Sequence, residues 1–418
     1  METYKFTEEV AVAGSYDVIV AGGGVAGVAA AVSASRMGKK ALLIEKTITL
    51  GGLATIGLIN FFVPMCNGRG TKIIKGMAQE FFDLSIKYGF DTVPSDWKDG
   101  NPPADTKQRY VTKFSIPIFI VALTELLKNE GVDILFDTVV SKPVMEGGVC
   151  RGVIVENKTG REMYLCKMIV DTTGDADVLY RAGVPTIQGT NFQTFLAKGV
   201  TLETCEEVVK TGDIAKLTCG YDGGFANLYG KNHPEGHRFW KGTDAHDVTD
   251  YVVESHINLL NNIRNDDRKT RDIIQLPTMP QFRTTRCIEG DYVFTQEDVY
   301  KHFDDSVGAI CDFERKNYLY EVPFGTLVRK GFPNIITAGR CASGKGYGWD
   351  LLRVIPPAII TGQAAGIAAS MAIDSGKAIY DIDIKSLQKT LEEQDVIIHF
   401  DDSLVIPGEA EKVDVGHI

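Results

Sequence analysis

The chain has 418 residues, more than one ordinary hydrophobic core accommodates, so two or three domains are expected. Hydrophobic residues make up 44% and charged residues 24%, which is ordinary globular usage. The 44 Lys and Arg are scattered and outnumbered by 55 Asp and Glu, giving a formal net charge of -11. This charge argues against a nucleic-acid partner and against an anionic membrane surface.

The first pattern along the chain is a strand, a glycine turn, a helix and a second strand. Tyr16 begins the segment YDVIVAGGGVAGVAAAVSASRMGKKALLIEK, in which a small-residue helix runs to about Met37 and the second strand ends at Glu45. This order predicts one βαβ unit. The N-terminus before it carries acidic residues where a secretory signal needs a basic flank, so no export signal is expected.

The next segments are interpreted as an excursion from the domain that contains this βαβ unit, followed by a return to it. Residues 47–70 resemble a loop, 75–88 have helical periodicity, and 91–105 are polar and contain prolines. A helix is expected at about Ile116 to Asn129, followed by a pair of strands whose NKTG centre is a hairpin signal. The chain then reaches DTTGDADVLYRAGVP at 171–185, a glycine turn at the end of a strand.

In the second half of the chain the composition first changes, and strand and helix patterns like those of the first half then follow. Residues 190–320 contain many aromatic and charged residues in short apolar runs, which indicates an inserted cap domain. FPNIITAGR then predicts a strand ending in a glycine turn. The uncharged stretch from Val354 to Ile373 is about as long as a membrane span, but its paired prolines, Pro356 and Pro357, favour a buried helix that presents small residues to a sheet.

The glycine turn of the βαβ unit satisfies G-x-G-x-x-G at the mouth of a helix. Gly22 permits the tight turn, Gly24 lets backbone amides approach a pyrophosphate, and Gly27 lets the helix pack close to the sheet. The helix N-terminus supplies partial positive charge. Glu45 lies roughly 20 residues on, where a carboxylate binds ribose hydroxyls and repels a 2′-phosphate.

This motif alone does not distinguish NAD from FAD. LGGLATIGLINFF from Leu50 adds a second glycine turn, and Asp171-Thr172-Thr173-Gly174-Asp175 adds a third. Three such turns suit one long, extended cofactor, which favours FAD.

With these residues in view, the chain resembles the FAD-dependent oxidoreductase family related to the glutathione-reductase and fumarate-reductase flavoproteins. The resemblance covers about residues 15–373 and is carried by the glycine motif with Glu45-Lys46, GGLA, DTTGDADVLYRAGVP, QFRTTRCIEGDYVFTQEDV, FDDSVG and AGRCASGKGYGWDLLRVIPPAIITGQAAGIAA. It implies a noncovalent FAD on a Rossmann-like, nucleotide-binding domain of the two-dinucleotide-binding type.

The resulting fold class is α/β, a discontinuous FAD-binding domain of the glutathione-reductase type with an inserted α+β substrate or cap domain. The expected boundaries are 15–60, 112–188 and 321–390 for the FAD-binding domain, 61–111 for an excursion near the flavin, 189–320 for the cap and 391–418 for a C-terminal tail. The expected cofactor-binding residues are Gly22, Gly24, Val25, Ala26, Gly27, Glu45, Lys46, Gly52, Leu53, Ala54, Val139, Thr173, Gly174, Asp175, Gly339, Arg340, Val354 and Pro356.

The candidates for substrate chemistry are three arginines and two residues of the loop after the last glycine turn. Arg353 is the expected anion or flavin-O2 ligand, unless it forms a salt bridge at a helix start. Arg283 and Arg286 either bind a substrate carboxylate or lock two domains together. Many relatives carry a histidine in the loop that here reads CASGKGYGWD. Lys345, Tyr347 and Asp350 remain there for proton transfer, and Lys345 and Tyr347 are the candidates for a general acid, with surface roles as the alternative.

Thiol and metal chemistry are not expected. The eight cysteines are dispersed without a CxxC pair, which predicts reduced thiols in a cytoplasmic protein, and Cys341 has no neighbouring partner for a disulfide relay. His233 and His237 are four residues apart, but Pro234 and Gly236 between them prevent the helix that would direct both at one ion. No metal site is predicted.

The sequence thus predicts an oxidoreductase in which FAD exchanges a hydride through N5 with a small organic substrate, anionic or oxygen-rich, bound beneath the cap. The alternatives are a flavin monooxygenase and a non-catalytic FAD-binding subunit for electron transfer or regulation. The expected partners are the small-molecule substrate and an unidentified electron donor or acceptor, with no membrane span. The sequence also permits a homo-oligomer.

Overall fold

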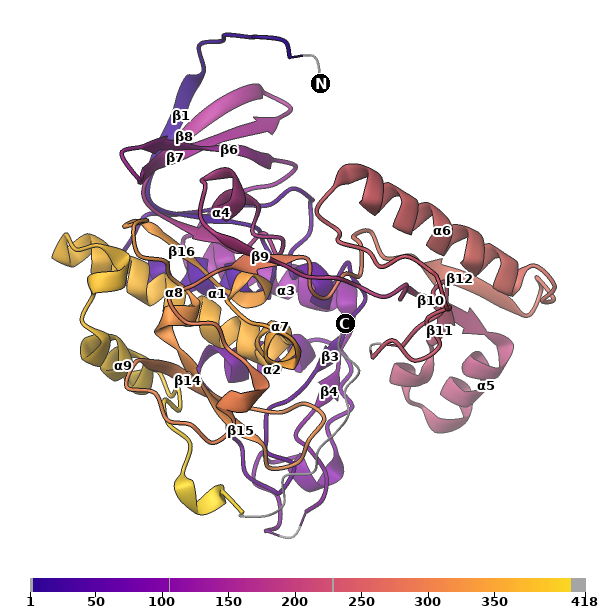
Figure 1. The fold of residues 1–418 in the computed structure, drawn as a ribbon. Coiled ribbons are helices and arrows are strands. Elements are labelled where there is room, and N and C mark those ends of the chain that lie inside the picture. Colours follow the sequence, from indigo (N-terminus) through magenta and orange to yellow (C-terminus); the bar gives the residue numbers. More distant parts are fainter. Residues whose placement is uncertain (1–2, 105, 228, 407–418) are drawn as a thin grey trace.

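The computed structural model describes residues 3–104, 106–227 and 229–406, and its centre is a seven-stranded sheet (Figure 1). The strands follow the order β5-β2-β1-β8-β7-β6, and β16 also pairs with β8. They are β1 (Ala11–Ala21), β2 (Ala41–Ile44), β5 (Asp133–Leu135), β6 (Val139–Glu146), β7 (Val149–Asn157), β8 (Gly160–Asp171) and β16 (Ile335–Thr337).

Strand β8 is long enough to serve two parts of this sheet. Near its start, Gly160 pairs with Asn157 of the antiparallel neighbour β7, and near its end Asp171 pairs with Thr337 of the parallel neighbour β16. Strand β1 runs parallel to β8 along its whole length. The carboxyl ends of β1, β8 and β16 therefore meet at one edge, where open α/β sheets bind their ligands.

Helices cover one face of the parallel part of the sheet. They are α1 (Val25–Arg36), α2 (Met77–Lys87), α3 (Ile116–Asn129), α7 (Tyr347–Arg353), α8 (Ile355–Ser375) and α9 (Ile384–Glu393). On β1, Val18 and Val20 face this helical layer, whereas Ile19 and Ala21 face a second cluster with β6, β7 and the short helix α4 (Asp177–Arg181). This alternation is the two-residue period of a strand that is buried on both faces.

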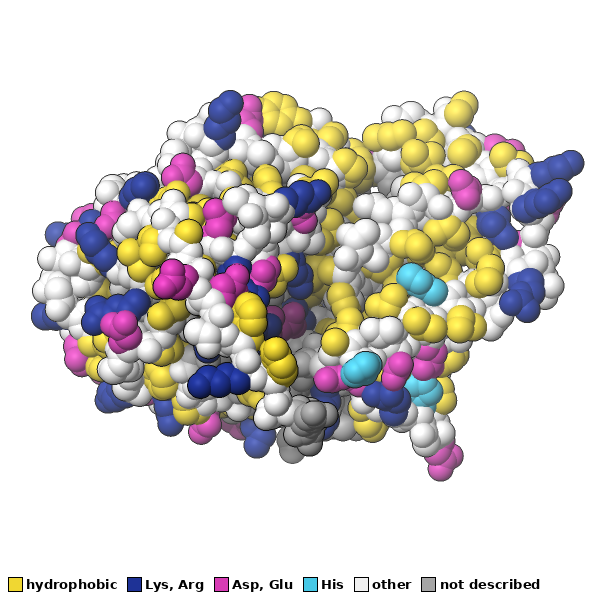
Figure 2. All heavy atoms as spheres, turned by 90° about the horizontal axis from the view of Figure 1, so that it is seen from above, with side chains coloured by type: hydrophobic (Ala, Val, Ile, Leu, Met, Phe, Trp, Pro, Cys, Tyr) yellow, Lys and Arg dark blue, Asp and Glu magenta, His cyan; other side chains and the backbone are white. Residues whose placement is uncertain are grey.

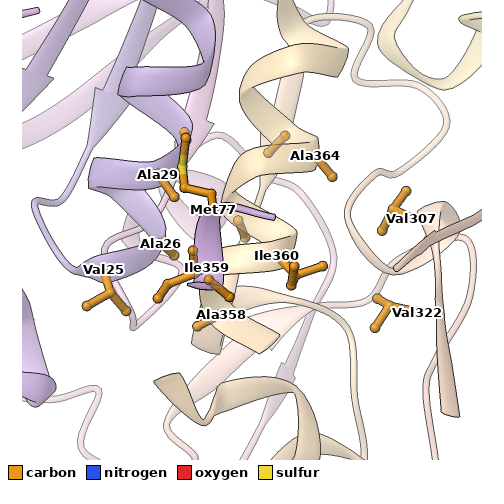
Figure 3. Packing of buried hydrophobic residues seen from close by; sticks show 14 of the residues in the cluster. Val25, Ala26, Ala29, Met77, Val307, Val322, Ala358, Ile359, Ile360 and Ala364 are labelled. Atoms are coloured by element: carbon orange, nitrogen blue, oxygen red, sulfur yellow. The ribbon is translucent and has the colours of Figure 1, made fainter. Parts of the chain in front are cut away.

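The predicted βαβ unit, the helix at 116–129 and the hairpin at NKTG are all present. The helix expected after the proline pair is α8, which has the length and apolar character of a membrane span but is 94% buried over its most apolar window. It was expected to present its small residues to the sheet. It does contact β8 and β16, but it packs most closely against α1 (Figure 3), where a Cβ at Gly362 would lie 2.3 Å from the carbonyl oxygen of Ala26.

The cap projects from one side of the main body (Figure 1), and a hollow separates the two on the face shown in Figure 2. It contains a sheet of β10 (Leu196–Thr201), β11 (Cys219–Asp222) and β12 (Arg271–Gln275), with α5 (Leu202–Thr211) and α6 (Ala245–Ile263). Its own hydrophobic cluster is Phe195, Ala197, Trp240, Tyr251, Leu259 and Phe282.

The end of the segment assigned to the cap packs elsewhere. Phe294, Val307 and Leu319 belong to the core of the main body, not to the cap cluster. Strand pairs join these outer segments: β9 (Thr186–Gln188) with β13 (Arg286–Ile288), β14 (Ser306–Cys311) with β15 (Leu319–Pro323), and β3 (Phe61–Phe62) with β4 (Thr112–Lys113). Of the expected tail at 391–418, residues 407–418 lie outside the described residues.

Candidate cofactor trough and substrate chamber

The glycine turn between β1 and α1 has three glycines with three different surroundings. Gly22 has a φ of +105°, which L side chains rarely adopt. A Cβ on Gly27 would lie 1.9 Å from the carbonyl oxygen of Gly22, so only glycine permits this approach of helix to strand. A Cβ on Gly24, in contrast, meets no heavy atom within 4 Å. The space in front of Gly24 is therefore open, at the N-terminus of α1.

Glu45 lies at the end of β2 and holds the glycine turn from the side. Its Oε2 accepts a hydrogen bond of 2.7 Å from the backbone N–H of Gly23, and its Oε1 accepts from the N–H and hydroxyl of Thr47. The side chain is largely buried but still lines a cavity. The carboxylate is thus oriented before any ligand arrives.

The turn after β8 is tied to the first glycine turn. The hydroxyl of Thr172 donates to the carbonyl oxygens of Ala21 and Gly22, at 3.0 and 2.8 Å. Asp171 is fully buried and accepts from the N–H groups of Thr173 and Leu179. Burial raises the pKa of Asp171 to about 6 despite these hydrogen bonds.

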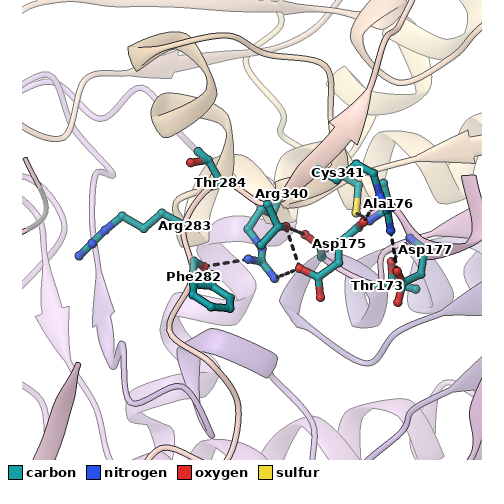
Figure 4. Close-up of polar contacts among 12 residues, drawn as sticks. Thr173, Asp175, Ala176, Asp177, Phe282, Arg283, Thr284, Arg340 and Cys341 are labelled. Atoms are coloured by element: carbon teal, nitrogen blue, oxygen red, sulfur yellow. Dashed lines mark hydrogen bonds and ion pairs between the residues drawn. The ribbon is translucent and has the colours of Figure 1, made fainter. Parts of the chain in front are cut away.

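The last glycine turn, at Gly339 and Arg340, is tied to the cap and to the turn after β8 (Figure 4). Arg340 donates to the carbonyl oxygen of Phe282 at 2.8 Å and pairs with Asp175 at 3.0 Å. The thiol of Cys341 accepts from the N–H of Ala176 at 3.3 Å, which agrees with a buried packing thiol. Figure 4 also shows Arg283 extending away from this cluster.

A narrow cavity, which we call the cofactor trough, runs across these turns and widens at one end. Its middle part has about 110 Å³ and its narrow end, beside Thr138 and Val139, about 60 Å³. The two parts share Gly22, Glu45, Lys46 and Thr173. At the other end the trough shares Leu53, Ala54, Arg353 and Ile355 with a cavity of about 450 Å³, the substrate chamber.

The model of the family described as FAD-dependent oxidoreductase matches residues 17–270 and 240–391. The chain belongs to this family. The lining of the trough fits the family's cofactor, because it includes the N-terminus of α1 at Gly24, where a Cβ would meet open space, and the carboxylate of Glu45.

The similar proteins found are more distant. The tRNA uridine 5-carboxymethylaminomethyl modification enzyme MnmG of Bacillus mycoides is 34% identical over 169 residues, which are 39% of this chain and 24% of that protein. MnmG of Lactobacillus johnsonii is 33% identical over 42% of this chain and 25% of that protein. The chain therefore matches only about a quarter of the length of these relatives.

Among solved structures, a geranylgeranyl bacteriochlorophyll reductase-like protein from Thermoplasma acidophilum has a TM-score of 0.45 at 14% identity, covering 93% of this chain and 94% of that one. This similarity is too low to indicate which reaction the chain catalyses.

Most of the residues expected to bind FAD line the cavities of this FAD-dependent oxidoreductase. Gly22, Gly24, Val25, Ala26, Glu45, Lys46, Gly52, Leu53, Ala54, Thr173, Gly174, Gly339 and Arg340 line the trough. Val139 lines its narrow end and Val354 lines the chamber. Three do not line these cavities: Gly27 contacts Gly22, Asp175 pairs with Arg340, and Pro356 is buried in the first turn of α8.

The five candidates for substrate chemistry are separated by the fold. Arg283 and Arg353 both line the substrate chamber. Arg286 does not, because it pairs with Asp177 at 2.8 Å and lies over the ring of Tyr180. Arg286 therefore links β13 to α4. Lys345 lines a neighbouring cavity of about 320 Å³ that shares Arg283 with the chamber.

Tyr347 lies away from these cavities. Its buried hydroxyl donates to Asp312 at 2.6 Å, and burial together with this carboxylate raises the pKa of Tyr347 far above its usual range. This arrangement places the phenol in the core of the main body.

Sequence reasoning missed several residues of the chamber. Thr194, Asn227, Gln281 and Glu314 contribute polar side chains, and Ile59, Phe61, Val63 and Phe313 contribute apolar ones. Phe61 and Val63 come from the excursion at 61–111 that was expected near the flavin, and Ile59 lies just before it. Gln281 begins the QFRTTR motif, whereas Thr194, Asn227 and Glu314 carry no local motif, and only the fold brings them together.

Proposed function

We propose that this FAD-dependent oxidoreductase exchanges a hydride between flavin N5 and a small organic substrate that carries an anionic group. The observation that supports this proposal is the pair of guanidinium groups, Arg283 and Arg353, in one chamber beside the trough. The bound FAD would supply the hydride chemistry, and the protein would orient the substrate and stabilise charge.

The two arginines differ in how they are neutralised. Arg353 pairs with Asp350, which accepts from its Nε at 2.6 Å. Arg283 donates to the hydroxyl of Thr194 at 3.1 Å, and among the described residues no carboxylate forms an ion pair with it. Burial, together with the nearby Arg353, lowers the pKa of Arg283 to about 10. An anion bound beside Arg283 would offset both the burial of this guanidinium and its repulsion from Arg353.

The rest of the chamber favours a substrate with a hydrocarbon part. Its apolar lining includes Phe195, Leu196 and Phe282 of the cap and Phe61 of the excursion. A volume of about 450 Å³ is within the usual range for small-molecule sites. We therefore infer a small organic acid, held by its acid group at Arg283 and by apolar contacts along its chain.

Helix α8 supports the electron chemistry of the site. It begins at Ile355 with Val354 as its N-cap, and the cap has no side-chain hydrogen bond. Both residues line the chamber, so the positive end of the helix faces the region where negative charge would gather on reduction. An adjacent cation would add to this stabilisation, and Arg353 lies directly before the cap.

The other class of substrate to consider is tRNA, because the relatives named MnmG are tRNA-modification enzymes. The charge of this chain, 44 basic against 55 acidic residues, favours a small molecule over a polyanion. A monooxygenase or a non-catalytic electron-transfer subunit is the competing interpretation of the flavin. Reduction of the flavin by a substrate without NAD(P)H would distinguish the proposal from both.

The experiment has two steps on the FAD-loaded chain. First, a panel of small organic acids, their neutral amides and bulk tRNA is tested anaerobically for bleaching of the flavin absorption. Second, acids that bind without reacting are titrated by their flavin difference spectrum. We expect acids but not amides to act, and Arg283→Gln to weaken their binding by at least tenfold with FAD retained.

The matched control is Arg264→Gln, an exposed arginine after α6, which should bind acids as the parent does. Equal action of acids and amides, or unchanged binding in Arg283→Gln, would contradict the proposal. Oxygen uptake that requires NAD(P)H and a bound acid would show a monooxygenase instead.

A further inference from the structure

Three potential metal ligands from distant parts of the chain meet outside the trough and chamber. Glu321 lies on β15, His302 in the loop before β14, and His399 in the segment after α9. One ligand atom from each lies within 4.8 Å of the others. His302 Nδ1 is 2.5 Å from Glu321 Oε1, and His399 Nδ1 is 2.9 Å from Glu321 Oε2.

The carboxylate at the centre of this cluster is fully buried. The side chain of Glu321 has no exposed surface, and its Oε2 also accepts from the N–H of Phe303 at 2.7 Å. A buried carboxylate is retained only where it is paired or coordinates a metal. The two imidazoles flank it from the solvent side and are 42% and 43% exposed for His302 and His399, so an ion can reach the cluster from water.

The second nitrogen of His302 is also paired with a carboxylate. His302 Nε2 lies 2.9 Å from Asp402 Oδ1, so this imidazole has a carboxylate at each nitrogen. Without a metal, only the protonated imidazolium donates to both carboxylates, since a neutral imidazole carries one N–H. A metal ion on Nδ1 would leave the N–H on Nε2 for Asp402, which is the usual carboxylate–histidine–metal arrangement.

We propose that His302, His399 and Glu321 bind a divalent transition-metal ion, with Zn²⁺ as the ion that suits them best. Two imidazoles and one carboxylate form a known zinc ligand set with one position left for water. Ligands at about 2.0–2.1 Å in a tetrahedron lie about 3.3 Å apart. The observed separations are 2.5 Å to Oε1 and 2.9 Å to Oε2 of the same carboxylate, and would widen by about 0.8 and 0.4 Å around one ion, which partly exposed imidazoles permit.

The ion would fasten the C-terminal segment to the main body. Residues of this segment already contact β14: Ala309 N–H donates to the carbonyl oxygen of Ile397, and the hydroxyl of Ser306 donates to that of Ile398. The ring of Phe400 stacks on His302 with centroids 4.3 Å apart. Bound Zn²⁺ would link His399 to β15 by a second connection, at a site whose ligands do not line the trough or the chamber.

The experiment measures zinc binding by the full FAD-loaded chain. After treatment with EDTA, the parent, His399→Ala and His302→Ala are dialysed against Zn²⁺ alone, and the retained metal is quantified. We expect one Zn²⁺ per parent chain, a melting temperature a few degrees higher with Zn²⁺, and at least a tenfold loss of affinity in either variant. Flavin absorption of each variant confirms that it is folded.

The matched control is His246→Ala, an exposed histidine at the start of α6, which should bind Zn²⁺ like the parent. Glu321→Gln keeps the shape of the buried residue and should also lose the metal. The proposal is overturned if the parent retains no stoichiometric Zn²⁺, or if His399→Ala and His302→Ala bind it as tightly as the parent. The cluster is then an ion-pair network of two histidines and one carboxylate.

Discussion

Arg340 and Asp175 join two turns that lie 165 positions apart in the chain, with Nη2 of the arginine 3.0 Å from Oδ1 of the aspartate. This ion pair ties the turn after β16 to the turn after β8. The same guanidinium also holds the carbonyl oxygen of Phe282, which belongs to the cap. Arg340 thus sets the position of the cap relative to the cofactor trough that it lines.

Replacing Arg340 with Gln should weaken both the fold and FAD binding. The buried carbonyl of Phe282 and the carboxylate of Asp175 would lose a charged donor, at about 2–3 kcal/mol of unfolding free energy. We expect a lower melting temperature and at least a tenfold higher Kd for FAD, measured by fluorescence titration. Arg151→Gln, which removes only an exposed pair with Glu146, is the control and should leave both quantities unchanged.

The glycines of the first turn separate folding from cofactor binding. Gly24→Ala places its methyl group in open space at an ordinary φ of −65°, so the apoprotein should keep its melting temperature while FAD affinity falls at least a hundredfold. Gly27→Ala places a Cβ 1.9 Å from the carbonyl oxygen of Gly22 and should lower the apoprotein's melting temperature markedly. An equally stable, FAD-binding Gly24→Ala protein would refute the assignment of the space to the cofactor.

Local patterns predicted those parts of the fold that are local. The glycine turn, the helix at 116–129 and the hairpin at NKTG depend on residues within one or two elements, and each is present. Glu45 could be placed at the trough for the same reason, because the spacing from the glycines to the end of β2 is short. These features also make up most of the cofactor trough.

Long-range contacts determine those features of the site and the fold that the sequence alone did not predict. Arg283 and Arg286 are three positions apart in one motif, yet the first lines the chamber and the second pairs with Asp177. His302, Glu321 and His399 have no motif spacing, since the ligands come from three segments. The close packing of α8 on α1, in addition to the sheet, could not be predicted either, because small residues permit close packing on a helix and on a sheet alike.

The packing of α8 on α1 makes a prediction about two glycines one turn apart. Gly362→Ala would press on Ala26, which lines the trough, whereas Gly366→Ala would press on Ala30, deeper along α1. A Cβ would lie 2.3 Å and 2.2 Å, respectively, from the two carbonyl oxygens. Both variants should have lower melting temperatures. Only Gly362→Ala should also bind FAD more weakly at a temperature where both are folded, and equal Kd values would contradict this coupling.

The buried Asp171 makes stability depend on pH in a defined direction. Its pKa is raised by burial from 3.8 to about 6, so between these values the folded protein holds a proton that the unfolded chain has released. The contribution of this group is fully present below pH 3.8 and is lost as the pH rises through about 6. Asp171→Asn cannot titrate at this position. The parent should therefore lose on the order of 1 kcal/mol relative to the variant between pH 5 and pH 8.

Urea unfolding of both proteins at these two pH values, each saturated with FAD, measures the difference. Only the change with pH is compared, because the amide of Asp171→Asn can accept from only one of the N–H groups of Thr173 and Leu179, and this loss is the same at both pH values. A parent-minus-variant difference that stays constant, or that grows with pH, would show that Asp171 is ionised throughout this range. Its hydrogen bonds to the turn would then outweigh its burial.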